Sequence, residues 1–253
     1  MTEKTTRTSP KRILEIIEAV ASKPDTATAA NLSKSLGIPL ATVYRHLETL
    51  CEERYIVLSA TGAYIPGAKF RSLAINSMVY EPEVTQRRAI LRKLSAQLEE
   101  TVSLSVPNGA KLIYFDRFES HWPVQVNLHI GDVLPLHCCA SGKLYLSSLK
   151  HEAALNVFEN LNPDERAPNT ITSLAVFADE LTAIRERGYA LDDQEWFHGM
   201  VGAAVPIRNS EGRFCASLST HALTSRKSLV QVDANISYMI EAATSLEKLF
   251  FEA

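Results

Sequence analysis

The residue types best suited to chemistry gather in one short stretch, LPLHCCASGKLYLS, at residues 134–147. In it His137 precedes the adjacent pair Cys138 and Cys139, and Ser-Gly-Lys follows at 141–143. Imidazole and thiolate groups bind zinc, an activated thiolate attacks acyl groups, Gly-Lys occurs in phosphate-binding loops, and a helix N-terminus attracts carboxylates. The stretch therefore allows four kinds of site, and the spacing of its residues must decide among them.

A metal or phosphate site fits this spacing poorly. Zinc ligands are usually separated by about two to four residues, whereas these three are sequence neighbours. Successive residues of a strand point to opposite faces, so three neighbours do not converge on one ion. A phosphate loop has two glycines before its lysine, but only Gly142 stands here. The sequence therefore predicts no metal and no bound cofactor.

A cysteine nucleophile stays open as an alternative. Cys138 or Cys139 would need nearby positive charge or a helix N-terminus to hold a thiolate, and His198 or His221 would have to act as the base. Nothing in the sequence brings these groups together, and free cysteines are commonly small buried side chains. The enzyme alternative is thus a cysteine-dependent hydrolase or transferase using Cys138 or Cys139.

A ligand site made of backbone amides needs only the residues that begin a helix. Ala140, Ser141 and Gly142 precede an apolar run with helical spacing that starts at Leu144. The free N–H groups and the positive dipole end of such a helix bind carboxylates. This reading favours a site for a small acidic effector.

Composition limits the class of protein. A chain of 253 residues with 46% hydrophobic and 22% charged residues is typical of one large or two modest globular domains. Four cysteines do not make a disulfide framework, and the polar N-terminus has no apolar signal-peptide core. No apolar run approaches the roughly 20 residues of a membrane helix. We therefore expect a cytoplasmic protein with reduced thiols.

The charge is unevenly distributed along the chain. Residues 1–70 hold nine Lys/Arg and seven Asp/Glu, a net of +2, whereas residues 71–253 hold 17 and 22, a net of −5, which together give −3. Phosphate neutralisation needs local cations. The mildly basic head is therefore the part that would contact nucleic acid.

The pattern in the N-terminal third predicts a helix-turn-helix. An amphipathic helix from Pro10 is followed by a short helix that stops at Gly37 and by a second helix that begins after Pro39. The second helix turns Val43, Leu47 and Leu50 inward and leaves other positions for the major groove of DNA. The predicted DNA-binding residues are Leu40, Ala41, Thr42, Tyr44 and Arg45.

The residues that follow predict a wing. The segment RYIVLSATGAYIPG has two β-rich runs around a turn that contains Thr61-Gly62. A hairpin directly after a recognition helix usually lies along the DNA backbone. His46 stands where such helices bury an aliphatic side chain, and we interpret it as a partly buried structural histidine.

The remaining sequence predicts an α+β domain. Residues 67–100 have a helical pattern with a break at 81–83, where Pro82 disfavours helix in the residue before it. Later patterns alternate between strand and helix and end in a long helix. The predicted strands are 102–106, 111–118, 124–130, 189–191, 199–208 and 213–220, and the predicted helices are 141–160, 173–187 and 228–251. This order favours an antiparallel sheet with helices packed on it.

Three motifs in this order resemble the IclR family of bacterial transcription regulators, over about residues 10–250. LGIPLATVYRHLETLCEERYI resembles the family's winged-helix segment, and LPLHCCASGKLYL resembles its Leu-x-x-His, small-residue and Gly-Lys motif before a helix. RERGYALDDQEWFHGMVGAAVPIRNSEGRFCASLS resembles its third signature. The run Gln194 to Phe197 is less acidic than is usual there, which leaves the identity of the effector open.

The resemblance implies an architecture and partners. The fold is expected to be α+β, with a winged helix-turn-helix at 1–66, a linker helix at 67–85 and a GAF-like effector domain at 86–253, in which helices flank an antiparallel sheet. Such proteins are homodimers or dimers of dimers that bind pseudo-palindromic operators. By motif position, the effector-binding residues are Ala140, Ser141, Gly142, Asp192, Met200, Gly202, Ser217 and Ser219.

The combined prediction is a DNA-binding transcriptional regulator and not an enzyme. A repressor of catabolic genes is expected from the habit of the family, and a small organic acid or semialdehyde is expected to control it. Ser217 and Ser219 lie two apart on a strand, so both hydroxyls face one side and could hold a carboxylate together with the amides of 140–142. Asp192 could accept a hydrogen bond from a hydroxyl or hydrated aldehyde at the other end of the effector.

Overall fold

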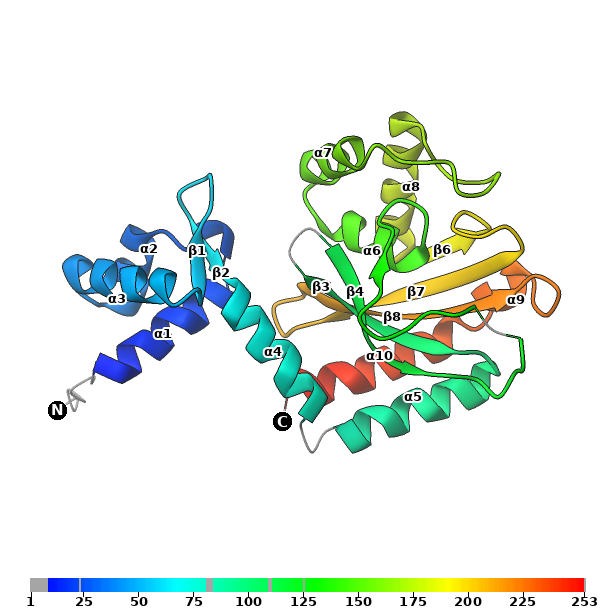
Figure 1. The fold of residues 1–253 in the computed structure, drawn as a ribbon, viewed down its shortest axis with the longest axis horizontal. Coiled ribbons are helices and arrows are strands. Elements are labelled where there is room, and N and C mark those ends of the chain that lie inside the picture. The colour runs from blue at the N-terminus through cyan, green and yellow to red at the C-terminus, as the bar shows by residue number, and fades with distance from the viewer. Residues whose placement is uncertain (1–8, 23, 81–83, 109–110, 125, 253) are drawn as a thin grey trace. The chain divides into compact units, whose positions relative to one another are not determined.

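The computed structural model describes residues 9–22, 24–80, 84–108, 111–124 and 126–252. The chain divides into two compact units, Met1–Glu81 and Pro82–Ala253 (Figure 1). The elements of the first unit are α1 (Ser9–Ser22), a 3-10 turn η1 (Pro24–Thr26), α2 (Ala29–Leu36), α3 (Leu40–Glu52), β1 (Ile56–Leu58), β2 (Tyr64–Pro66) and α4 (Ala68–Tyr80).

Local chemistry at the ends of α2 positions α3. The Thr28 side chain accepts a hydrogen bond from the Asn31 amide at 3.3 Å and so caps the N-terminus of α2. Gly37 ends α2 with φ of 62°, the left-handed conformation that glycine adopts without strain. Pro39 then stands immediately before the first residue of α3, where its fixed φ suits helix entry. This short turn makes α2 and α3 the predicted helix-turn-helix.

A small apolar core holds the first unit together. Ile16 and Val20 of α1 pack with Leu32 of α2 and with Val43 and Leu47 of α3. Burial of these side chains offsets the weak intrinsic stability of such short helices. The β1–β2 pair is an antiparallel hairpin, and its turn is the predicted wing.

The second unit is built on one antiparallel sheet with the strand order β5-β4-β3-β8-β7-β6. Its strands are β3 (Val102–Asn108), β4 (Lys111–Phe118), β5 (Val133–Leu134), β6 (Ala190–Asp193), β7 (Met200–Arg208) and β8 (Phe214–Leu223). Its helices are α5 (Val84–Leu98), α6 (Ala140–Ser148), α7 (His151–Leu161), α8 (Leu174–Arg187), α9 (Leu229–Asp233) and α10 (Ile236–Phe251).

Helices cover both faces of this sheet. Figure 1 shows α5 and α10 along one face and α6, α7 and α8 over the other. Leu104 and Leu218 are directly opposed on β3 and β8 and are fully buried. The next row, Ser103 with Ser219, points to the opposite face because side chains alternate along a strand. The sheet therefore has a strongly apolar face and a face that carries polar groups.

Three predicted elements, one strand and two helices, differ from the structure. No strand occurs in the described part of residues 124–130; β5 lies later, at Val133–Leu134. Val126 and Leu128 pack against the core without joining a ladder, which explains the alternating pattern that suggested a strand. The predicted helices 141–160 and 228–251 are each two helices, because Leu149 and Asn235 leave helical geometry. The predicted break at 81–83 lies outside the described residues.

Candidate functional site

The outward face of α3 is the candidate nucleic-acid interface. Leu40 and Tyr44 are 44% and 54% exposed, and Ala41 and Arg45 are also exposed. At 3.6 residues per turn these four side chains share one side of the helix. Thr42 is half-buried and lies away from the centre of this side. The structure thus brings four of the five predicted DNA-binding residues onto a common surface and places Thr42 at its margin.

His46 is enclosed in the same helix. It is buried, and its pKa is lowered by burial first and then by the charges of Arg45 and Arg12. A neutral imidazole on the inner face of α3 supports the core of the first unit, as the structural interpretation of His46 expects.

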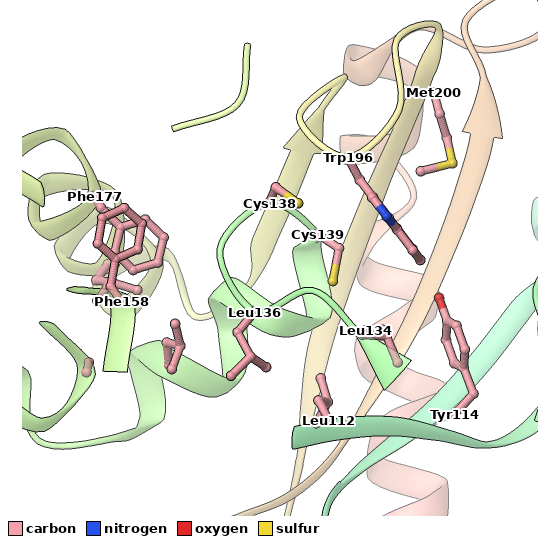
Figure 2. Close-up of a cluster of buried hydrophobic side chains, with 13 residues drawn as sticks. Leu112, Tyr114, Leu134, Leu136, Cys138, Cys139, Phe158, Phe177, Trp196 and Met200 are labelled. Atoms are coloured by element: carbon pink, nitrogen blue, oxygen red, sulfur yellow. The ribbon is translucent and has the colours of Figure 1, made fainter. Parts of the chain in front are cut away.

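The second unit contains a cavity between the N-terminus of α6 and the polar face of the sheet. The empty space between its lining residues, open solvent at its mouth included, is about 270 Å³, and the cavity proper is small, at about 20 Å³. Figure 2 shows the side chains of Tyr114, Cys139, Trp196 and Met200 around one region beside α6. The lining residues are Tyr114, Leu134, Cys139, Ala140, Ser141, Asp192, Trp196, Met200, Gly202, Ser219, Thr220 and His221.

Six of the eight predicted effector-binding residues line this cavity. The structure brings together Ala140, Ser141, Asp192, Met200, Gly202 and Ser219 from α6, β6, β7 and β8. Ser141 is buried, and its hydroxyl has no hydrogen-bond partner among the described residues. It is therefore able to bind a ligand atom.

Ser217 and Gly142, two of the predicted effector-binding residues, are not among the residues that line the cavity. The Ser217 hydroxyl is fully buried and shares a 2.6 Å hydrogen bond with the Ser105 hydroxyl. The Gly142 amide donates to the Cys139 sulfur at 3.3 Å, so Cys139 is the N-cap of α6. The carboxylate clamp predicted from paired serines and helix amides therefore retains Ser219 but neither the Ser217 hydroxyl nor the Gly142 amide.

Gly142 has a packing role instead. A Cβ at this position would lie 2.4 Å from the Pro135 carbonyl oxygen and 2.6 Å from the Leu136 Cα. Only glycine lets α6 approach the preceding loop this closely.

Asp192 lines the cavity and is a titratable group whose pKa is strongly shifted. Burial raises its pKa to about 7, although its Oδ1 accepts a hydrogen bond from the Glu195 amide at 2.8 Å. Near neutral pH the carboxyl group is present in both protonation states. It can therefore accept a hydrogen bond from a ligand or donate one to it.

Two further lining residues, Tyr114 and His221, were not predicted. Burial raises the pKa of Tyr114, and burial followed by the charge of Arg117 lowers the pKa of His221 to about 4. Both groups are therefore neutral at pH 7. His221 continues the alternation of Ser217 and Ser219 on β8, a signal that could have identified it.

Neither cysteine has the environment of a nucleophile. Burial raises the pKa of Cys138 to about 12 and the pKa of Cys139 well above its ordinary value. The His137 ring faces the Asp164 carbonyl at 3.1 Å. Both thiols are protonated at neutral pH, and of the two only Cys139 lines the cavity.

A buried charge cluster lies next to the cavity. The Lys143 ammonium is almost fully buried and pairs with Glu195 and, at 3.1 Å, with Glu180. Burial opposes its charge, but the two carboxylates raise the pKa of Lys143 above its ordinary value. Arg187 contacts Glu180 at 2.9 Å and completes the cluster. Because Glu195 follows Asp192 closely in sequence, the cluster links the cavity wall to α6 and α8.

The described residues contain no group of three or more His, Cys, Asp or Glu side chains that could hold a metal ion. Within the same part of the chain, no helix is both long enough and apolar enough to cross a membrane.

Comparisons with known proteins agree with the two-unit organisation. The family models "IclR helix-turn-helix domain" and "Bacterial transcriptional regulator IclR C-terminal" match residues 9–59 and 83–248. The chain is 31% identical over 243 residues to "Probable transcriptional regulator SauR" of Cupriavidus necator, which covers 95% of each chain. It is 29% identical over 220 residues to "DNA-binding transcriptional repressor YiaJ" of Escherichia coli, covering 85% of this chain and 78% of that one.

A solved structure of a related domain contains a ligand. It is a double mutant of the PobR inducer-binding domain of Acinetobacter, in complex with 3-hydroxybenzoic acid. The TM-score is 0.59 and the identity 29%, over 67% of this chain and 99% of that one.

A helix-turn-helix unit joined to an α+β unit of this kind defines a DNA-binding transcriptional regulator. With both family models matched, the chain belongs to the IclR family of bacterial transcriptional regulators. The predicted fold class is confirmed. Its relatives are regulators and not enzymes, so the alternative of a cysteine-dependent hydrolase or transferase is set aside.

Proposed function

We propose that this regulator is a cytoplasmic repressor of catabolic genes and that a small organic acid or semialdehyde controls it from the cavity of the second unit. The observation that carries this proposal is the cavity itself, which combines an unpartnered Ser141 hydroxyl, Ser219 and a carboxyl group titrating near neutrality. The 3-hydroxybenzoic acid bound to the PobR domain supports an organic acid as the effector. The similarity to the repressor YiaJ supports a role in repression.

Each of the three segments of the chain has its own role in this regulation. Residues 1–66 bind a pseudo-palindromic operator through the exposed face of α3, residues 67–85 act as a linker helix, and residues 86–253 bind the effector. The chain acts as a homodimer or a dimer of dimers, since two-fold symmetry in the protein matches two operator half-sites. The effector changes operator affinity only if it binds the DNA-competent and DNA-incompetent states unequally.

A gel-shift assay on the DNA upstream of the regulator's own gene tests this function. The full chain is expected to retard the DNA at low salt, and a member of a panel of small aliphatic and aromatic acids and aldehydes is expected to change the affinity. Ser141→Ala and Ser219→Ala should keep DNA binding but raise the effector concentration needed by about tenfold, since each removes a hydrogen bond to a charged ligand.

Ser148→Ala is the matched control, because Ser148 is exposed on the same helix α6 and outside the cavity. Its effector response should equal that of the unmodified chain. Absence of a retarded band at low salt would exclude operator binding, and a response that no cavity variant alters would exclude control from this cavity.

A further inference from the structure

Arg117 of β4 is a buried cation with unused hydrogen-bond donors. The residue is 8% exposed, and among the described residues its Nε and Nη1 atoms have no hydrogen-bond partner, although the guanidinium does hydrogen-bond the Tyr114 side chain. Glu119 and Asp132 act on it electrostatically, but in the described part of the chain neither forms a salt bridge with it. Removing a guanidinium without a salt-bridge partner from water is costly, and arginine stays protonated in proteins. Arg117 therefore has both the charge and the free donors to bind an anion.

This guanidinium is not among the lining residues, but it packs directly against one of them. Its Cζ lies 4.9 Å from the centroid of the Tyr114 ring, and Tyr114 lines the cavity. Its charge also acts on His221, a second lining residue on a different strand. Arg117 is thus immediately behind the cavity wall that Tyr114 and His221 form.

A row of polar side chains connects Arg117 with the cavity. Ser103 of β3 is directly opposed to Arg117 on one side and to Ser219 on the other, so the three side chains share one face of the sheet. The buried Ser103 hydroxyl has no hydrogen-bond partner. The Ser219 hydroxyl donates only a long hydrogen bond of 3.4 Å, to the Ser103 carbonyl oxygen. All three residues can therefore turn donors toward a ligand.

We propose that Arg117, Ser103 and Ser219 form an anion subsite that takes the carboxylate of the effector. The inference rests on the proposed function, in which the cavity holds a small acid. A guanidinium binds a carboxylate with two parallel hydrogen bonds, and the hydroxyls add further donors. Asp192 is left to contact the other end of the ligand, so the ligand class is a small carboxylate with a hydroxyl or hydrated aldehyde group.

Acetate and its neutral isostere acetamide are suitable probes, because both are small and they differ in charge but hardly in shape. The thermal unfolding midpoint of the full chain is measured with each probe for the unmodified chain, Arg117→Lys and Arg117→Met. Acetate at about ten times its Kd should raise the midpoint of the unmodified chain by roughly 3 °C. Arg117→Lys should keep part of this shift, Arg117→Met should show none, and acetamide should shift no protein.

Equal acetate shifts in Arg117→Met and the unmodified chain would overturn the proposal, as would the absence of a shift in both. Ser103→Ala serves if Arg117→Met fails to fold: it keeps the cation and should weaken acetate binding several-fold. An unchanged affinity would also overturn the subsite. Fluorescence of Trp196, which lines the cavity, gives a second measure of acetate binding.

The gel-shift assay separates this inference from the proposed function. Acetate binding that depends on Arg117, with no acid of the panel changing DNA affinity, would support the subsite and contradict the control of DNA binding. Acids that change DNA affinity equally in the unmodified chain and in Arg117→Met would support the control and overturn the subsite.

Discussion

Asp192 shows how a single residue couples the stability of the fold to pH. Its pKa in the folded protein is about 7, against 3.8 ordinarily, because burial penalises the carboxylate. Between these two values the folded state binds more protons than the unfolded state. The free energy of unfolding therefore falls as pH rises from about 4 to 7 and does not change further, through this group, above pH 7.

Asp192→Asn removes this dependence while keeping the oxygen that accepts from the Glu195 amide. At pH 8 the variant should be more stable than the unmodified chain by at most about 4 kcal/mol, and at pH 5 by less than half of that. Urea unfolding at both pH values measures the difference. Asp193→Asn, at the exposed neighbour, is the control and should show no such trend. A gain that is the same at pH 5 and pH 8 would contradict the assignment.

At the N-terminus of α6 the Cys139 side chain occupies a backbone amide that was expected to bind a ligand. The sequence suggested that free amides at 140–142 hold a carboxylate, but the Cys139 sulfur accepts the hydrogen bond of the Gly142 amide. The thiol is thus a cap whose burial holds it protonated. A sequence shows that a cysteine precedes a helix, but it does not show which way its side chain turns.

At the scale of elements, α3 carries the clearest consequence for DNA binding. Arg45→Ala should lower operator affinity by about 10- to 100-fold, because we expect its exposed guanidinium to contact bases or phosphates. Effector binding should stay unchanged. Gel shifts and effector titrations of the same preparation measure both quantities.

Glu52→Ala is the control for α3, since Glu52 is exposed at the last position of that helix. Its operator affinity should not fall. Retained operator affinity in Arg45→Ala would show that another surface of the first unit contacts DNA.

Helices and strands were predictable from the sequence where their burial imposes a single hydrophobic period. They were less predictable elsewhere. The strand at 111–118 agrees with β4 because Leu112 and Tyr114 alternate with half-exposed neighbours on a buried sheet. The segment 124–130 has the same alternation, yet Val126 and Leu128 reach the core from a loop. Hydrophobic period reports which side chains are buried, and it does not report whether the backbone joins a ladder.

The same limit applies to the cavity. Ser219 was predicted from its place in a motif, whereas Tyr114 belongs to a strand that only the sheet order brings close to it. Ser217 lies on the same side of β8, but its partner Ser105 comes from a strand more than a hundred residues earlier in the chain. Cross-strand register decides such partners, and no local pattern encodes it.

At the scale of the whole molecule, operator recognition is expected to need more than one chain. Mass photometry of the full chain with its upstream DNA should give two or four chains per duplex and no single-chain complex, because symmetric half-sites require a symmetric protein. Affinity should fall steeply between 50 and 200 mM salt as bound cations are released from DNA. A stable complex of one chain with DNA would contradict the proposed oligomer.

Beside the charge cluster around Lys143, we expect ligand binding in the cavity to be coupled to proton binding. The formal charges of Lys143, Arg187, Glu180 and Glu195 cancel, so among these residues and Asp192 only the Asp192 carboxyl group changes its charge near pH 7. An anion in the cavity stabilises the protonated form of Asp192, and we expect its entry to be accompanied by proton uptake from solvent. The affinity for an anionic effector is therefore expected to rise as the pH falls through about 7.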